Sequence, residues 1–137
     1  MIGGGHDVPD KMAVFKKHYT REEARQLLPA VVGWIDELAR LRGILQECEE
    51  QMARQLRQGE DLGGKAVDRS VRAMASIKTV LFEFKRREIQ LKDIDRGLVD
   101  FPAFIAGREV FLCWEKGEDD IEFWHDLESG YAGREKL

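Results

Sequence analysis

The chain has 137 residues, 43% of them hydrophobic and 35% charged, so it is long enough to bury the core of one ordinary domain without disulfides. Its formal net charge of -4, from 22 basic and 26 acidic residues, argues against a nucleic-acid partner, which needs a basic surface. The chain has no run of about eighteen apolar residues, and its N-terminus lacks the apolar run of a signal peptide, so we expect no membrane partner.

The two cysteines, Cys48 and Cys113, lie in apolar surroundings and lack paired spacing. This pattern is typical of buried thiols in a reducing compartment and predicts a cytoplasmic protein. Residues 1–12 hold three consecutive glycines and little apolar content, which predicts a flexible tail. Residues 13–137 are expected to form a single α+β domain, and the alternation in Ala13–Tyr19 permits a short strand at its start.

A capping box begins the first predicted helix. The Thr20 hydroxyl can accept a hydrogen bond from the backbone N–H of Glu23, and the Glu23 carboxylate can accept one from the N–H of Thr20. Pro29 lies inside the helix and cannot donate to the carbonyl of Arg25, which predicts a kink there, and the helix should end near Arg57. Apolar residues at spacings of three and four form a seam for another helix: Leu27, Val31, Trp34, Leu38, Leu41, Leu45, Cys48 and Met52.

A glycine-rich loop, Gln58–Gly64, separates this helix from a second one over about Lys65–Glu88. Because the loop is short, residues 20–88 are predicted to form a long antiparallel helical hairpin. The first helix would be about 55 Å long, whereas a compact monomer of this size is about 37 Å across. We therefore expect a homodimer whose hairpins form a four-helix bundle. The seam of the second helix is Val67, Val71, Met74, Ile77, Leu81 and Phe84.

Beyond Glu88 the apolar period changes from near 3.6 to 2, which predicts strands. Residues 89–134 are therefore expected to form a small antiparallel β-meander that packs on the hairpin. Pro102 lacks an amide donor and belongs at a strand end or a bulge. The predicted strands are Ile89–Ile94, Leu98–Pro102, Glu109–Trp114 and Asp120–His125.

The strand pairing assigns each side chain to one of two faces. A tight first turn puts Lys92 opposite Asp100, a longer loop over 103–108 puts Phe111 beside Asp100, and Leu98 lies beside Cys113. One face then collects Lys92, Asp100, Phe111, Cys113, Glu122 and Trp124. The other face is core and collects Leu91, Val99, Phe101, Val110, Leu112, Trp114, Ile121 and Phe123.

The last strand leaves two alternatives open. A slip of one residue at the turn before it would bring Phe123 and His125 to the face that otherwise holds Glu122 and Trp124. The stretch also begins with a capping-box pattern, so a short helix competes with the strand over residues 120–128.

The reactive side chains of this region each have a structural and a functional interpretation. His125 with Glu122 and Asp126 could hold a divalent metal, because imidazole and carboxylate ligands suit Zn, Mn or Fe, although a histidine at a strand end is more often a hydrogen-bonded part of the structure. Cys113 could be a nucleophile with His125 as its base, but a cysteine in an apolar run is typical of an inert buried thiol. Lys92 and Asp100 are explained by a cross-strand ion pair or by contact with a ligand.

Two further side chains have the same double interpretation. Trp124 either lines a pocket or belongs to the core. Arg134, in a tail with two glycines, either clamps a carboxylate or phosphate or pins the tail to the sheet. No catalytic residue is assigned. The candidate ligand-binding residues at the rim of the sheet are Asp95, Asp100, Cys113, Glu122, Trp124, His125 and Arg134.

Several motifs taken together resemble a prokaryotic family known as domain of unknown function family 2203. The resemblance covers about Tyr19–Arg134 and implies a bacterial or archaeal cytoplasmic protein, with no activity, ligand or catalytic residue to carry over. It rests on Tyr19-Thr20, Glu22-Glu23-Ala24, Leu27-Leu28-Pro29, Lys92-Asp93, Asp95, Gly97 to Ala103, Gly107-Arg108-Glu109-Val110, Leu112-Cys113-Trp114, Gly117-Glu118, Ile121, Trp124-His125, Gly130 and Ala132-Gly133-Arg134.

The sequence contains no catalytic motif, and it has two long helices that each carry an apolar seam. The leading hypothesis is therefore a dimeric interaction or regulatory module. The alternative is a small-molecule or metal-binding protein, or an enzyme, with its site at the sheet rim around His125. The two differ in whether His125 and its neighbours converge on a cavity.

Overall fold

A computed structural model describes residues 12–60 and 64–137 of the chain. The chain forms two compact units, one made of Met1–Val32 with Phe84–Leu137 and the other of Gly33–Glu83. A tail was predicted for residues 1–12, and all of these residues except Met12 lie outside the described residues. A single domain over residues 13–137 stays a prediction.

Helix α1, Arg21–Arg57, begins at the predicted capping box and ends at the predicted residue. The backbone N–H of Glu23 donates to the Thr20 hydroxyl at 3.0 Å, and the N–H of Thr20 donates to Glu23 Oε1 at 2.9 Å. The capping box is therefore confirmed. The helix continues through Pro29, and the kink expected there stays a prediction.

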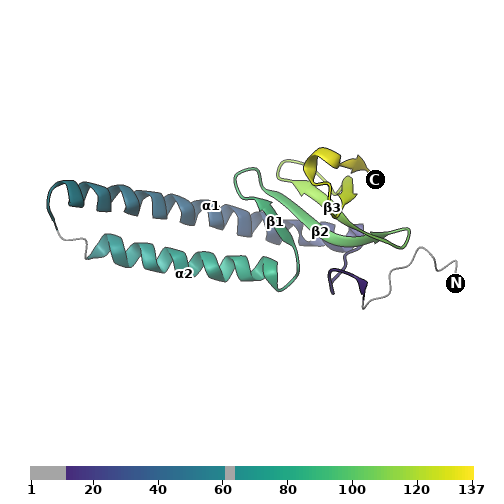
Figure 1. Ribbon diagram of the computed structural model, residues 1–137, viewed down its shortest axis with the longest axis horizontal. Helices are drawn as coiled ribbons and strands as arrows, with labels where there is room; N and C mark the ends of the chain where they lie inside the picture. Colours follow the sequence, from purple (N-terminus) through teal and green to yellow (C-terminus); the bar gives the residue numbers. More distant parts are fainter. Residues whose placement is uncertain (1–11, 61–63) are drawn as a thin grey trace. The chain divides into compact units, whose positions relative to one another are not determined.

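The unit Gly33–Glu83 is a helical hairpin, as predicted. The C-terminal part of α1 runs antiparallel to α2, Lys65–Lys85 (Figure 1). The buried seam of α1 in this unit is Ile35, Leu38, Leu41 and Cys48, in keeping with the predicted pattern. Neither helix is both long and apolar enough, within the described ranges, to cross a membrane.

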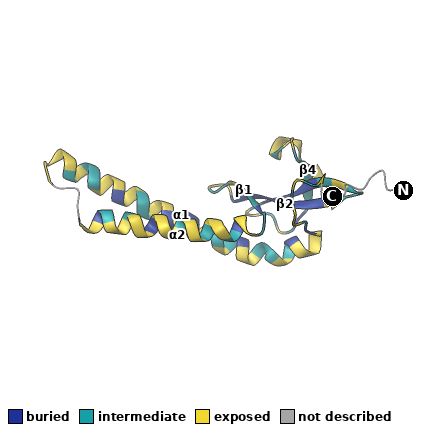
Figure 2. Cartoon of the chain, turned by 60° about the horizontal axis from the view of Figure 1, so that its bottom comes forward, coloured by how far each residue is buried: buried dark blue, intermediate teal, exposed yellow. Residues whose placement is uncertain are grey.

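The single chain buries only part of the seam predicted for α2. Ala66, Ala73 and Phe84 are buried, whereas Val71 and Met74 are 58% and 49% exposed. The helix buries small alanines, which let two helix backbones approach closely, and leaves larger apolar side chains exposed. Figure 2 shows buried positions interspersed with exposed ones along α2. The apolar period alone did not distinguish these two adjacent faces.

The other unit is built on an antiparallel sheet of five strands in the order β1-β2-β3-β4-β5. The predicted meander of four strands is confirmed, and a fifth short strand follows it. The strand predicted for Ala13–Tyr19 is wrong, although the N–H of Tyr19 does donate to the carbonyl of Pro102 at 2.7 Å. The strands are β1, Gln90–Asp93; β2, Leu98–Ile105; β3, Arg108–Glu115; β4, Phe123–Asp126; and β5, Glu135–Lys136.

The predicted register of β2 against β3 is wrong by two residues. Instead of a long loop, the strands are joined by a tight turn at Ala106 and Gly107, which have φ angles of 51° and 78°. Positive φ at both central residues is typical of the turns that join two-residue hairpins. Asp100 consequently pairs with Cys113 rather than with Phe111. A shift of two residues leaves every side chain on its predicted face.

The predicted pairing of Lys92 with Asp100 is also wrong. Gln90 pairs with Asp100, and the register shifts between Leu91 and Asp93, so Lys92 lies at a β-bulge. A bulge adds one residue to one strand and redirects its side chain. Pro102 lies inside β2 rather than at its end. The pairing of β1 with β2 stops at Asp100, so at Pro102 the side of β2 that faces β1 has no neighbouring strand.

The last strand takes the slipped register, so its predicted side-chain assignment is wrong. His125 pairs with Phe111, and Phe123 pairs with Cys113, which places both on the face of Asp100. Trp124 pairs with Leu112 on the opposite face. The segment is a strand, and the competing helix over 120–128 does not form.

Contacts from the start of α1 hold the connection that leads into β4. Arg25 donates to both carboxylate oxygens of Asp120, at 2.8 and 3.0 Å, and Arg21 donates to the carbonyl of Ile121 at 2.7 Å. The Arg25 guanidinium, aided by the Ile121 N–H, lowers the pKa of Asp120 to about 2. On the core face of the sheet, the Tyr19 ring packs edge-on against Phe101. These contacts fix where β4 begins, and with it the position of His125.

Candidate functional site

Three reactive side chains converge on one face of the sheet. Asp100 comes from β2, Cys113 from β3 and His125 from β4, and their exposed fractions are only 1%, 0% and 2%. One carboxylate oxygen, the thiol sulfur and one imidazole nitrogen all lie within 4.8 Å of one another. Within residues 12–60 and 64–137, this is the one group of three such side chains close enough to share a metal ion.

The sheet register explains the convergence. Asp100 and Cys113 are direct cross-strand partners, and His125 lies opposite Phe111, two residues before Cys113. Side chains two residues apart in a strand point to the same face, so the three groups are neighbours on adjacent strands. With the register predicted for β4, His125 would have pointed to the opposite face.

His125 is held by hydrogen-bond contacts at both of its ring nitrogens. Nδ1 lies 2.7 Å from the backbone carbonyl oxygen of Asp126, and Nε2 lies 3.0 Å from Oδ1 of Asp100. In either neutral tautomer of the imidazole, one nitrogen would point its lone pair at an oxygen. An additional proton, on the ring or on Asp100, or a metal cation between Nε2 and the carboxylate removes this repulsion. The arrangement is therefore a buried site that calls for one positive charge.

The Cys113 thiol is the third member of the group. Burial, together with the negative charge of Asp100 and a hydrogen bond to it, raises the pKa of this thiol well above its ordinary value. Without a cation Cys113 is thus a neutral thiol that donates to Asp100. Both nitrogens of His125 lie at hydrogen-bond distance from oxygens, Nδ1 from the Asp126 carbonyl and Nε2 from Asp100, rather than being engaged with the thiol. This geometry does not favour a nucleophile with His125 as its base.

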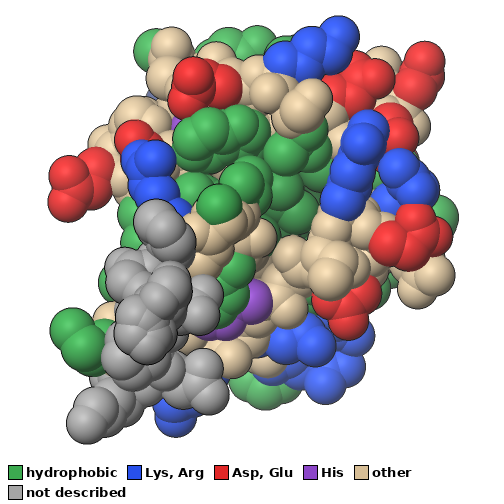
Figure 3. All heavy atoms as spheres, turned by 90° about the vertical axis from the view of Figure 1, so that its right-hand side faces the viewer, with side chains coloured by type: hydrophobic (Ala, Val, Ile, Leu, Met, Phe, Trp, Pro, Cys, Tyr) green, Lys and Arg blue, Asp and Glu red, His purple; other side chains and the backbone are tan. Residues whose placement is uncertain are grey.

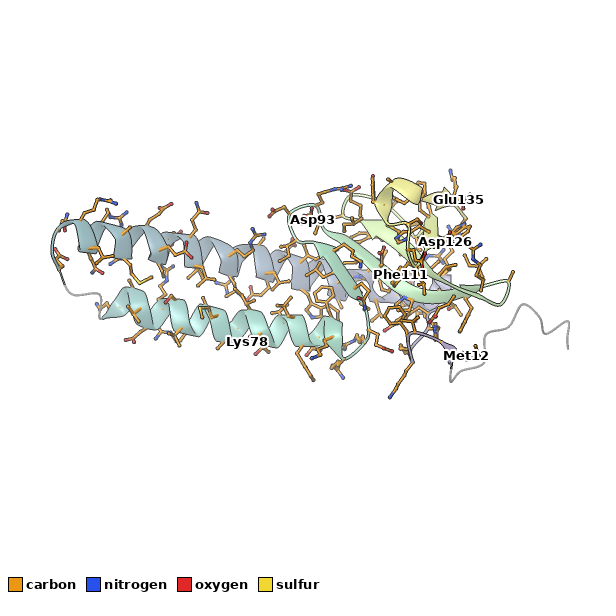
Figure 4. The ribbon with its side chains drawn as sticks, viewed as in Figure 1. Met12, Lys78, Asp93, Phe111, Asp126 and Glu135 are labelled. Carbon is orange, nitrogen blue, oxygen red and sulfur yellow. The ribbon has the colours of Figure 1, made fainter. Side chains whose placement is uncertain are left out.

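A cavity of about 270 Å³ opens onto the three side chains. Its walls come from the four longest strands of the sheet and from the segment that follows β4. Leu98 and Phe111 are its buried apolar residues, and Lys92 lies at its edge. Figure 4 labels Phe111 in the sheet and Asp126 near the end of β4. The remaining residues along its walls are Asp100, Cys113, His125, Leu127, Glu128, Ser129, Gly130 and Tyr131.

A second, shallower depression of about 500 Å³ borders the same turn. It is larger, but its main polar feature is the ion pair between Arg108 and Asp126, which satisfies both groups. It reaches none of the three buried side chains. On the face presented in Figure 3, hydrophobic side chains gather at the centre and charged ones lie around them. We assign the candidate site to the smaller cavity, because only there do buried reactive groups face open space.

The other predicted site residues lie away from this group. Asp95 belongs to the turn between β1 and β2, and Glu122 precedes β4. Trp124 and Asp126 flank His125 in the strand, so alternation turns their side chains to the opposite face, where the Arg108 guanidinium lies over the Trp124 ring. The structure therefore places the carboxylates of Glu122 and Asp126 outside the group that contains His125.

Arg134 pins the C-terminal segment to the sheet. Its guanidinium donates to Glu118 and lies 3.9 Å from the centre of the Phe123 ring and 4.6 Å from that of Tyr131. Arg96 lies over the same Tyr131 ring at 4.2 Å. The arginine thus acts within the chain, and it holds Tyr131 at the edge of the cavity.

Sequence reasoning did not identify the part of the cavity wall that follows β4. Leu127 and Ser129 follow the last predicted strand without a motif, and Leu98 was placed beside Cys113 without a role in a site. Gly130 and Tyr131 belong to the glycine-containing tail in which Arg134 was a candidate residue. The glycines of that tail were the sequence feature that could have indicated a turn at the cavity. Gly130 has a φ of 67°, so the chain needs a residue without a side chain to turn there.

The comparisons with known proteins place the chain in a family. No curated protein and no solved structure matches it. A family model described as "Uncharacterized conserved protein (DUF2203)" matches residues 17–137, which is nearly the whole chain. The matched residues include the start of α1, the strands that line the cavity and Arg134. Because the match spans nearly the whole chain, the chain belongs to the DUF2203 family.

Proposed function

We propose that this protein binds one divalent transition-metal ion through Asp100, Cys113 and His125. The observation that carries the proposal is the convergence of a carboxylate oxygen, a thiol sulfur and an imidazole nitrogen, all buried, on an open cavity. Carboxylates, thiolates and imidazoles are common metal ligands in proteins, and both structural and catalytic sites use them together. The proposal takes up the metal-site alternative and changes two of its three ligands.

The hydrogen bond at Nδ1 of His125 supports the proposal. A metal-binding histidine usually donates its other ring N–H to a backbone carbonyl or a carboxylate, which sets the tautomer and the ring orientation. Here the Asp126 carbonyl takes that role and directs the lone pair of Nε2 toward Asp100. An ion at this point would supply the positive charge that the two facing acceptors require.

The distances fit an ion after small side-chain movements. Ligand atoms about 2.0–2.3 Å from a tetrahedral zinc ion lie roughly 3.3–3.8 Å from one another. The three atoms here lie within 4.8 Å of one another, and the imidazole and carboxylate are already 3.0 Å apart. To admit an ion, the imidazole nitrogen and the carboxylate oxygen would move slightly apart from their separation of 3.0 Å, and the sulfur would adjust with them.

The ligand set also indicates the kind of metal and its chemistry. One sulfur, one nitrogen and one oxygen ligand suit zinc or ferrous iron better than magnesium or calcium, which prefer oxygen alone. Three protein ligands with a fourth position open to a cavity are typical of catalytic rather than structural zinc sites. Such an ion polarises a bound water or ligand oxygen.

Cobalt(II) titration of untagged protein tests the proposal. Cobalt should bind in a 1:1 ratio and give the visible and thiolate charge-transfer absorption of a sulfur-ligated ion, and zinc should displace it. Replacing one ligand is expected to lower the affinity by at least 10- to 100-fold, the loss that follows even from removing a group that only hydrogen-bonds to a metal ligand. Cys113→Ser should therefore remove the charge-transfer band.

Cys48→Ser is the matched control, because Cys48 is also a free, buried cysteine and lies in the other unit. This variant should retain the cobalt spectrum of the wild type. A wild-type protein that takes up no cobalt or zinc, or a charge-transfer band that survives in Cys113→Ser, would overturn the proposal.

We also propose that the protein is a homodimer, with the helical hairpins as the interface of a four-helix bundle. The support is the set of large apolar side chains that α2 leaves exposed on one face, where Val71, Met74 and Leu81 recur at spacings of three and seven. A seam of this type fits the same seam of a second copy, as a two-fold interface requires. The free thiols support the cytoplasm as the site of action.

Sedimentation equilibrium at micromolar to high micromolar concentration tests the dimer. The wild type should sediment as a dimer, and Met74→Glu should shift the population toward monomer, because a charge would enter an apolar interface. Ser76→Glu is the control, since Ser76 is exposed on another side of the same helix. A monomeric wild type at high micromolar concentration removes the proposal.

A further inference from the structure

The geometry points to a small aliphatic monocarboxylate as the ligand of the cavity, with one oxygen at the open metal position and the other toward Lys92. This inference rests on the proposed metal site and adds the class of molecule that the site takes. The argument combines a cation at the rim of the cavity, an apolar wall and the volume of the space between them. All three belong to the same unit of the chain.

Lys92 is placed by a feature of the backbone. It occupies the β-bulge of β1, where the regular alternation of the strand is interrupted, and its side chain lies along the cavity with Asp100 and His125. Bulges are common next to functional sites, where they redirect a side chain. The Nζ of Lys92 lies 5.6 Å from the centre of the Phe111 ring, which also faces the cavity. A ligand oxygen between the metal position and this ammonium group would be attracted from both sides.

The wall of the cavity selects a ligand with a short hydrocarbon part. Leu98 and Phe111 are only 6% and 4% exposed, and Leu127, in the turn after β4, lines the same cavity. The volume of about 270 Å³ is slightly below that of typical drug-sized pockets, which begin at about 300 Å³. A molecule with a carboxylate and a few carbon atoms fits, and a nucleotide does not.

The charges favour a monocarboxylate over a phosphate. Phosphate sites usually present several backbone N–H groups or an arginine, whereas this cavity offers a single lysine as its cation. Glu128, at the same rim, carries the opposite charge and is exposed. It repels a second negative charge on the ligand, so a monoanion is favoured over a dianion.

The test uses the cobalt-loaded protein with three probes: propionate, its neutral analogue propionamide, and inorganic phosphate. Propionate should change the visible cobalt spectrum in a saturable manner, and the other two should need much higher concentrations. The cobalt affinity of each variant is measured first. Lys92→Met, which keeps the length of the side chain, should weaken propionate binding about tenfold, as expected for loss of a charge-assisted contact. Glu128→Gln should strengthen it about twofold, since an exposed charge is worth little.

Each outcome decides a separate point. No cobalt spectrum in the wild type overturns the metal site and this inference with it. A normal cobalt spectrum that propionate leaves unchanged overturns the inference alone, as does equal binding of propionate and propionamide. Tighter binding of phosphate than of propionate, or weaker propionate binding in Glu128→Gln, would assign the cavity to a different class of ligand and sink the monocarboxylate.

Discussion

Replacing Asp100 with alanine is expected to lower the free energy of unfolding of the metal-free protein by about 3–5 kcal/mol, the cost of removing one partner from a buried pair. Oδ1 of Asp100 lies 3.0 Å from Nε2 of His125, the carboxylate accepts from the Cys113 thiol, and each of the three side chains is at most 2% exposed. Without the carboxylate, the ring nitrogen and the thiol both lose their buried polar partner. Urea unfolding with excess chelator measures the loss.

The matched control is Asp119→Ala, which removes an exposed carboxylate just before β4 and should change stability by no more than about 0.5 kcal/mol. Combining Asp100→Ala with His125→Ala should cost less than the sum of the two single changes, because the second change removes the group that the first leaves unpaired. Additive costs, or a loss below about 1 kcal/mol for Asp100→Ala, would mean that the pair does not act as a buried charged unit.

Zinc is expected to raise the melting temperature by roughly 10 °C when its free concentration is about 1,000 times its dissociation constant. Binding to the folded state alone then adds about 4 kcal/mol to the free energy of unfolding, and each kcal/mol shifts the melting temperature of a chain of this size by a few degrees. Thermal unfolding followed by circular dichroism, with and without buffered zinc, measures the increment. A chelator should reverse it.

The increment distinguishes the site from general zinc binding by cysteine and histidine. The zinc-induced rise in melting temperature should be abolished in Cys113→Ser and retained in Cys48→Ser, although both variants alter a buried thiol. The rise is measured for each variant relative to its own melting temperature without zinc. An equal increment in both variants would show that zinc acts elsewhere on the chain.

The elements of the fold followed from local patterns. The capping box of Thr20 and Glu23 marked where α1 begins, and the change of apolar period marked where the strands begin. Two-residue alternation also put Asp100 and Cys113 on one face, even though the turn at Ala106 and Gly107 shifted the pairing by two residues. Even shifts preserve the face of every side chain, which is why this part of the site was predictable.

The rest of the site depended on an odd shift and on contacts between distant segments. A one-residue difference in β4 decides whether His125 or Trp124 faces Asp100, and the local sequence allows both. The contacts of Arg21 and Arg25 with the connection before β4 link residues about 100 positions apart in the chain. No local pattern carries that information.

Local patterns along the chain are sufficient to predict the α+β class, the two helices, the order of the strands and the membership of Asp100 and Cys113 in one face. These depend on the period of apolar residues and on capping and turn residues, which act over a few positions of the chain. Three features emerge from the folded chain alone: His125 joins these two residues, Lys92 occupies a bulge at the rim, and a cavity opens above the three buried groups. Register, bulges and cavities are set by packing between segments far apart in the chain, so they arise only when those segments meet.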